Sequence, residues 1–361
     1  MTRSVFVPLV LLTTGLSAAE IPPSGAPDFR QPQLAAAYGQ VALVYGSGST
    51  IWFASSPDSG RTFAPGVKVA DTGAVALGRH RGPRITILRD AMLITAVAGQ
   101  TPAQGEHAHG LPEQGDLTVW RSTDHGKTWL RASIVNDIPG ASREGLHSIA
   151  ADSRGNLFAA WLDLREKGTQ LYGARSTDGG KTWSKNVHIY ASPDGTICQC
   201  CDPSVAIDEH GEIAVMFRNA ITGSRDLYLT RSTDGLHFSQ PEKLGNGTWK
   251  IAACPMDGGG MALEHGKIVT AWRRDTELFL DRPGTPETRI AEGKDVAIAA
   301  GAKGTYLVWS DAQGIEALAP AARVPLKIAG AGGFPTVVAL ADGSALAAWE
   351  DNGNIRTVRL P

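Results

Sequence analysis

The chain is poor in cysteine, almost balanced in charge and nearly without long apolar runs. It has four cysteines in 361 residues, and its formal net charge at pH 7 is -2. So small a charge offers no bulk attraction to nucleic acid or to an anionic membrane surface. Beyond the first twenty residues, no apolar run is long enough to span a bilayer, and no segment has the periodicity of a long amphipathic helix. These absences argue against a nucleic-acid-binding, a membrane-spanning or a mainly helical protein.

The one apolar run lies at the start of the chain and has the pattern of an export signal. Arg3 supplies a positive charge, residues 5–12 are apolar, and Ser17, Ala18 and Ala19 form a small-residue cleavage site. We therefore expect residues 1–19 to be a signal peptide and residues 20–361 to be one mature domain without a transmembrane segment. The protein is then exported, to the periplasm or the medium, where conditions are oxidising.

The rest of the chain is built from short apolar runs separated by turns, which 42 glycines favour. The clearest unit has three such runs, residues 204–207, 213–217 and 227–229, and ends in Ser232-Thr233-Asp234-Gly235. Runs of this length, rich in Val, Ile, Phe and Tyr, are typical of antiparallel strands joined by tight turns. A sheet of three or four short strands is marginal by itself, so it must pack against similar sheets.

Seven comparable units follow one another along the chain, with first strands that begin near Gln33, Arg84, His147, Ser204, Gly260, Val296 and Pro335. This repeat predicts an all-β protein, a seven-bladed β-propeller in a single domain. Six blades with unit one as an appendage is the alternative. Unit seven lacks a fourth strand, and we expect the extended segment after the signal peptide to supply it and close the ring.

Four of the units end in the pattern Ser-x-Asp-x-Gly-x-Thr-aromatic, at residues 56–63, 122–129, 176–183 and, one residue shorter, 232–238. The Asp carboxylate accepts hydrogen bonds from amides of its own turn, and Gly permits a positive φ. We therefore predict a structural role for the four aspartates, Asp58, Asp124, Asp178 and Asp234. The aromatic residue, Trp129 in unit two and Trp183 in unit three, should pack at the hairpin turn.

These motifs resemble the Asp boxes of the sialidase superfamily, and the resemblance extends through units two to seven. Arg84-Ile85-Thr86 stands where sialidases have Arg-Ile-Pro, Asp202-Pro203 stands where they have Glu-Pro, and Phe217-Arg218-Asn219 matches a strand that ends in Arg-Asn. Arg273 and Arg274 end the corresponding strand of the next unit. The resemblance implies that Arg84, Arg218 and one of these two form a cluster that binds the carboxylate of an acidic glycan.

The chain departs from the sialidase pattern where the chemistry would occur. Phe334 stands where the resemblance places the nucleophilic Tyr, and a phenyl ring has no oxygen for attack. Asp202 replaces its Glu partner with a shorter side chain. The acid would come from the loop at residues 99–116, which offers Glu106, Glu113, Asp116, His107 and His109. The other candidates for a displaced nucleophile are Tyr38, Tyr45, Tyr172, Tyr190, Tyr228 and Tyr306.

The four cysteines form two groups, one before the first strand of unit four and one before that of unit five. Cys198, Cys200 and Cys201 make up the first group and Cys254 the second. Equivalent positions of adjacent blades lie side by side, so we expect Cys254 to approach the other three. In an exported protein, a disulfide between the two units is the default. The alternative is a copper(I) or zinc site of these thiolates, with His147 or Met256 as a further ligand.

Three functions are compatible with these features. The first is a non-hydrolytic sialidase-like propeller that binds an acidic glycan or a soft metal at the channel mouth. The second is an exo-sialidase or related glycoside hydrolase with a displaced nucleophile. The third is a scaffold propeller without a small-molecule site. The missing Tyr weighs against the second, and the gathering of Arg, Asp and Cys residues at predicted channel-facing positions weighs against the third.

Overall fold

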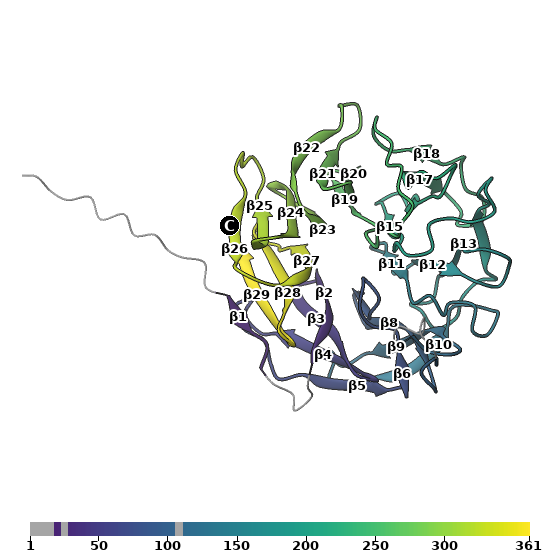
Figure 1. Cartoon of the computed structure of the whole chain (residues 1–361). Helices are drawn as coiled ribbons and strands as arrows, with labels where there is room; N and C mark the ends of the chain where they lie inside the picture. The colour runs from purple at the N-terminus through teal and green to yellow at the C-terminus, as the bar shows by residue number, and fades with distance from the viewer. Residues whose placement is uncertain (1–17, 23–27, 105–110) are drawn as a thin grey trace, which may run out of the picture.

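The computed structural model describes residues 18–22, 28–104 and 111–361, and over these residues the chain forms strands and no helix. The strands make seven sheets that follow one another around a ring, as the colour gradient in Figure 1 shows. The first strands of neighbouring sheets lie against one another around the centre of the ring. The predicted seven-bladed β-propeller is therefore confirmed, and unit one is a blade of the ring.

The first four blades hold strands 2 to 18. Blade one contains β2 (Arg30–Ala37), β3 (Gln40–Ser47), β4 (Thr50–Ser56) and β5 (Val67–Asp71). Blade two contains β6 (Ala74–Val75), β7 (Arg84–Ile87), β8 (Met92–Gly99), β9 (Asp116–Ser122) and β10 (Leu130–Ile134). Blade three contains β11 (His147–Ala151), β12 (Leu157–Asp163), β13 (Gln170–Ser176) and β14 (Val187–Tyr190). Blade four contains β15 (Ser204–Ile207), β16 (Ile213–Arg218), β17 (Leu227–Ser232) and β18 (Glu242–Lys243).

The last three blades complete the ring. Blade five contains β19 (Gly260–Glu264), β20 (Lys267–Arg274), β21 (Glu277–Asp281) and β22 (Thr288–Glu292). Blade six contains β23 (Lys294–Gly301), β24 (Gly304–Asp311), β25 (Gly314–Leu318) and β26 (Leu326–Ala329). Blade seven contains β27 (Gly333–Ala339), β28 (Ala345–Asp351), β29 (Asn354–Leu360) and β1 (Ala19–Glu20).

Both ends of the described chain meet in blade seven. Strand β1 pairs antiparallel with β29, with Ala19 opposite Thr357 and Glu20 opposite Arg356. The pairing continues past β1, because the Ile21 amide donates to the Ile355 carbonyl at 3.1 Å. The N-terminal side of the chain thus closes the ring as predicted, but the closing strand begins at Ala19, the last residue of the expected signal peptide. It covers the edge that β29 would otherwise expose.

The hydrophobic core is divided among the seven contacts between adjacent blades. Each contact has its own cluster of buried side chains, drawn from two neighbouring sheets. Trp161, Trp309 and Trp349 come from second strands and are almost fully buried. Each sheet is apolar on both faces for this reason, and no blade can bury its apolar surface alone.

The four Asp-box turns form the hydrogen bonds that their sequence predicts. The carboxylates of Asp58, Asp124 and Asp178 accept the amide of the Thr four residues later at 2.8, 2.9 and 3.0 Å. Asp234, in the shorter copy, accepts the His237 amide at 2.9 Å. Trp129 packs against Phe53 of blade one, with ring centroids 5.2 Å apart. These aspartates are committed to their own turns.

Candidate functional site

A cavity of about 280 Å³ opens at one mouth of the central channel. Every blade contributes to its lining, through residues at or just before its first strand: Gln31, Arg84, Ser148, Asp202, Asp257, Asp295 and Phe334. Arg84 and Asp202, which the resemblance to sialidases singled out, both lie in this lining. Phe334, which stands where the resemblance places the nucleophilic Tyr, also lies in the lining.

Three neighbouring blades reach the cavity through strained backbone. Gln31, Asp295 and Phe334 have φ angles of 54°, 57° and 51°, a region that non-glycine residues seldom adopt. The register of each first strand shifts at these residues, so each is part of a β-bulge. Bulges turn side chains in new directions, and strained residues of this kind cluster at functional sites.

One strongly perturbed group of the cavity is His80, from the loop before β7. Its Nε2 lies 2.9 Å from Oδ1 of Asp295. Burial by itself would lower the pKa of His80, but the charge of Asp202 and the hydrogen bond to Asp295 outweigh burial and raise the pKa to about 9. His80 is therefore an imidazolium at neutral pH. The ring of Phe334 packs edge-on against it, with centroids 5.3 Å apart.

Two of the three aspartates in the lining are fully engaged in holding the site together. Asp257 is 1% exposed, and its two oxygens accept the amides of Gly259 at 3.2 Å and Asp295 at 2.9 Å. Burial and the charge of Asp295 raise the pKa of Asp257. Asp295 accepts hydrogen bonds from His80 and from the Ser310 hydroxyl, at 2.9 and 2.8 Å. Each oxygen of both carboxylates therefore already accepts a hydrogen bond from the protein.

Asp202 differs from the other two aspartates. Its Oδ2 lies 3.8 Å from the Arg84 guanidinium, and its Oδ1 is buried without a hydrogen-bond partner among the described residues. Arg84 is itself held by backbone, because it donates to the carbonyls of His80 at 2.6 Å and Gly82 at 3.3 Å. Asp202 is thus the one of these three aspartates to which no group of the described chain donates a hydrogen bond, and its side chain is 16% exposed.

The arginine cluster implied by the resemblance is not assembled around this cavity. Arg218 is 2% exposed and donates to the carbonyls of Asp257, Arg225 and Arg273 at 3.0, 2.5 and 3.1 Å. Arg273 lies over the Trp249 ring, and Arg274 pairs with Glu287 at 2.8 Å. Arg84 alone lines the cavity, so three guanidinium groups do not converge on one carboxylate. Through these hydrogen bonds, Arg218 links backbone segments of blades four and five.

The candidates for a catalytic acid and a displaced nucleophile also lie elsewhere. Glu106, His107 and His109 fall outside the described residues. Glu113 and Asp116 line a separate depression on blade two, and Asp116 binds the Asn136 side chain and the Gly140 amide. Within the described chain, no tyrosine lines the channel cavity. The site therefore lacks the nucleophile that the resemblance requires.

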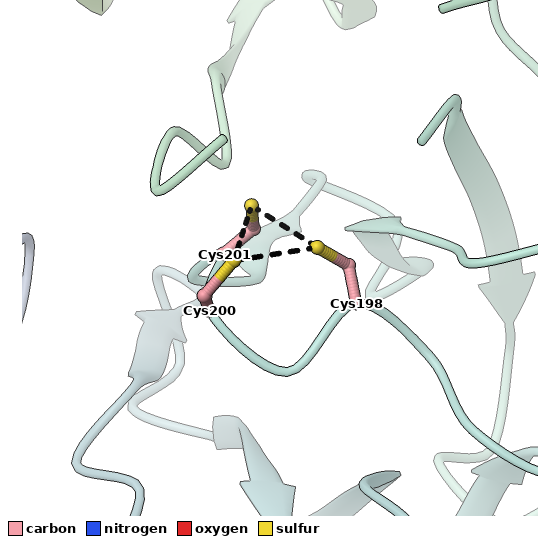
Figure 2. Close-up of side chains that lie close together, drawn as sticks. All are labelled: Cys198, Cys200 and Cys201. Carbon is pink, nitrogen blue, oxygen red and sulfur yellow. Dashed lines mark hydrogen bonds between the residues drawn. The ribbon is translucent and has the colours of Figure 1, made fainter. Parts of the chain in front are cut away.

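Three of the four cysteines form a compact buried group just before β15. Figure 2 shows the side chains of Cys198, Cys200 and Cys201 directed toward one another. The Sγ–Sγ distances are 3.4 Å for Cys198–Cys201, 3.6 Å for Cys198–Cys200 and 3.9 Å for Cys200–Cys201. Cys254 is exposed and lies outside this group, and all four cysteines are free. The predicted disulfide between units four and five is not present, since the Cys254 loop turns its thiol to solvent.

His147 is not part of the cysteine group either. Its Nε2 lies 3.0 Å from the Thr95 hydroxyl, on the buried side of β11. Burial and the nearby Arg84 charge lower the pKa of His147 to about 3, so the ring is neutral. Met256 does lie against the three cysteines.

The sequence analysis missed His80, Asp257, Asp295 and Gln31. All four precede or begin first strands, at positions equivalent to Asp202 and Phe334 in other blades. Because equivalent positions converge in a propeller, listing the polar residues at these places would have found them. Their individual contacts depend on β-bulges that no sequence pattern predicts.

Comparisons with known proteins agree with the fold. Residues 113–278 match the family model described as BNR repeat-like domain. No curated protein sequence matches the chain significantly. Among solved structures, an α-L-arabinanase from Penicillium chrysogenum complexed with arabinobiose has a TM-score of 0.59 at 15% identity, over 96% of this chain and 98% of that one.

Two further structures are similar in fold. A polysaccharide lyase, an ulvan lyase, has a TM-score of 0.58 at 11% identity and covers 93% of this chain and 94% of its own. A leech intramolecular trans-sialidase complexed with 2,7-anhydro-Neu5Ac has a TM-score of 0.57 at 12% identity, over 97% of this chain and 70% of that one. These similarities show the β-propeller fold that the seven sheets of the chain form. Among the described residues, no helix is long and apolar enough to cross a membrane.

Proposed function

We propose that this protein is an exported β-propeller that binds a carbohydrate in the channel-mouth cavity without cleaving it. The observation that carries the proposal is the unequal state of the three aspartates: no group of the described chain donates a hydrogen bond to the partly exposed Asp202, while every oxygen of Asp257 and Asp295 accepts one. Export itself stays a prediction from residues 1–19, of which most lie outside the described chain, and fractionation of producing cells tests it.

Cleavage of a glycosidic bond needs two groups that act on the substrate, usually two carboxyl groups or, in sialidases, a Tyr with its Glu. The described cavity offers one available carboxylate and a phenyl ring in the place of the Tyr. The imidazolium of His80 is already bound to Asp295 and has a pKa of about 9, so it releases its proton too reluctantly to serve as the acid. These groups are suited to binding a glycan but not to hydrolysing it.

The charges favour a neutral glycan over the acidic one that the resemblance implied. Arg84 and His80 are the cations of the lining, and both are already satisfied by backbone carbonyls or by Asp295. A ligand carboxylate would meet Asp202 with no free guanidinium to offset the repulsion. Sugar hydroxyls, by contrast, donate well to the partly exposed carboxylate of Asp202, and the Phe334 ring gives a pyranose or furanose an apolar face.

The fold comparison supports the same class of ligand. The structures of similar fold named above are described as an arabinanase, an ulvan lyase and a trans-sialidase, all of which act on glycans. At 11 to 15% identity these similarities concern the fold alone, so the choice of a neutral sugar rests on the cavity.

A glycan array of neutral, amino and acidic oligosaccharides, probed with the full mature chain, tests the proposal. We expect binding among the neutral glycans, confirmed by calorimetry with the strongest one. Asp202→Ala should weaken that binding at least about tenfold, since a hydrogen bond to a charged acceptor contributes about 1.5–3 kcal/mol. Asp90→Ala, in an exposed turn away from the cavity, is the matched control and should bind normally.

The same glycan is then incubated with the protein, and the products are separated by chromatography. No shorter sugar should appear. Turnover that Asp202→Asn abolishes would show that the cavity is a hydrolase site after all. A protein that binds no glycan on the array, or that binds equally well after Asp202→Ala, would overturn the proposed function.

A further inference from the structure

The cysteine group adjoins the channel cavity but takes no part in its lining. Cys201 directly precedes Asp202, and Met256 directly precedes Asp257. Cys198 is fixed to the end of β16, because its amide donates to the Arg218 carbonyl at 3.0 Å and Ile197 forms a bridge with Asn219. The three thiols are thus held on one short loop whose two ends are anchored in blade four.

The sulfur positions match the requirements of a single metal ion. With edges of 3.4, 3.6 and 3.9 Å, the centre of the sulfur triangle lies about 2.1 Å from each Sγ. An ion slightly above this plane reaches the usual metal–thiolate length of about 2.3 Å without movement of the chain. The same distances are far longer than a disulfide bond of about 2.05 Å, so the group is not arranged as a bridge.

We propose that Cys198, Cys200, Cys201 and the thioether of Met256 form a site for one copper(I) ion. Met256 packs against the three cysteines, and its φ of 52° is unusual for a methionine, so its loop is held in a costly conformation beside them. Thiolate and thioether are both soft ligands, a set that selects copper(I). Zinc usually completes a three-cysteine site with His or a fourth Cys. Neither His147 nor Cys254 joins the group.

A buried positive charge stands beside the group. Arg218 is 2% exposed and forms no ion pair within the described chain, since its guanidinium donates to backbone carbonyls. Three thiolates with one copper(I) carry a net charge of -2, and a nearby guanidinium offsets part of the cost of burying it. Each thiol releases its proton as it binds the ion, so affinity rises with pH.

The test uses the full mature chain, reduced and handled without oxygen. Copper(I) is supplied as its complex with bicinchoninate, which competes for the ion and reports its transfer by colour. We expect transfer of one copper(I) per chain, with about three sulfur neighbours near 2.3 Å by X-ray absorption. Cys198→Ser and Cys201→Ser should each reduce the affinity by at least about a hundredfold. Cys254→Ser removes a cysteine outside the group and should leave the affinity unchanged.

Met256→Leu separates copper(I) from zinc. The change keeps the side-chain volume and removes the thioether, so copper(I) affinity should fall about tenfold while weak zinc binding stays as it was. Circular dichroism checks the fold of every variant. If Cys198→Ser does not fold, Cys200→Ser gives the same comparison.

Several outcomes would overturn the inference. These are no transfer from bicinchoninate, equal losses in Cys254→Ser and Cys198→Ser, or zinc that binds more tightly than copper(I). Mass spectrometry that finds a stable disulfide among the three cysteines, unaffected by reductant, would also overturn it. A failure here leaves glycan binding untouched, because Asp202 is tested separately.

Discussion

The Asp-box turns and the channel mouth use the same side chain in opposite ways. Asp124 accepts three hydrogen bonds from within residues 122–128, in an exposed turn. Those bonds, to the Thr128 hydroxyl and amide first, lower its pKa. At the channel mouth, Asp295 of blade six binds His80 of blade two, and Asp257 of blade five binds the Asp295 amide. The first arrangement is local, while the second joins blades.

This difference predicts how the two regions respond to mutation. A turn that is satisfied by its own residues loses a local contact when one partner is removed. The channel mouth loses the link between blades, and it leaves buried groups without partners, which is the more costly event. Three changes test this comparison, in order of decreasing effect.

The largest effect should come from Arg218→Met. The substitution removes all three donors that the guanidinium gives to the carbonyls of Arg225, Asp257 and Arg273. Hydrogen bonds from charged donors contribute about 1.5–3 kcal/mol each and are not additive, so we expect the free energy of unfolding to fall by about 3–5 kcal/mol. Urea denaturation of the native chain and of the variant measures this difference in the free energy of unfolding.

Arg289→Met is the matched control for Arg218→Met. Arg289 is about half exposed and pairs with Glu277 and Glu292 at the surface, so its loss should change stability by less than about 1 kcal/mol. Similar losses in both variants would mean that the channel mouth is not held by Arg218.

The second effect depends on pH and concerns His80. Its pKa of about 9 in the folded chain exceeds the ordinary value of 6.5. The protonated ring therefore contributes stability that is fully present below about pH 6.5 and is lost as the pH rises to about 9. At 1.36 kcal/mol per pKa unit, the expected loss between these values is about 3 kcal/mol.

Urea denaturation at pH 6.5 and pH 9, for the native chain and for His80→Gln, isolates this contribution from other groups that titrate. Without the imidazole, the free energy of unfolding of the variant should change less between pH 6.5 and pH 9 than that of the native chain. An equal slope in both proteins would show that the bond to Asp295 does not raise the pKa of His80.

The smallest effect should come from Ser122→Ala in an Asp box. The Ser122 hydroxyl is 1% exposed, donates to Asp124 at 2.8 Å and accepts the Gly126 amide at 2.9 Å. Its loss leaves that buried amide without this partner, so we expect about 1–2 kcal/mol of destabilisation by thermal or urea unfolding. Ser153→Ala, in an exposed turn, should have almost no effect. A loss in Ser122→Ala as large as that of Arg218→Met would contradict the distinction between local and interblade contacts.

Much of the fold was predictable because it depends on short-range patterns. The seven units, the Asp-box turns and the closure of blade seven by the N-terminal segment were all predicted, since alternation and turn residues act within a few positions. The site was predicted only in part. Arg84 and Asp202 line the cavity, but Arg218, Arg273 and Arg274 do not, because the side chains at strand ends in a propeller can contact loops instead of the channel.

The sequence by itself determined the all-β repeat and the commitment of Asp58, Asp124, Asp178 and Asp234 to their turns, because each of these requires only neighbours along the chain. The structure decided between seven blades and six. Tertiary structure alone decided three features. Asp202 accepts no hydrogen bond from the described chain, Arg218 is buried and donates to backbone carbonyls, and Cys254 lies apart from the other three cysteines. These outcomes depend on β-bulges and loop paths that bring residues of different blades within hydrogen-bond distance. The physical reason is that a contact between distant segments depends on how whole sheets pack against one another. No single stretch of sequence contains the information on that packing.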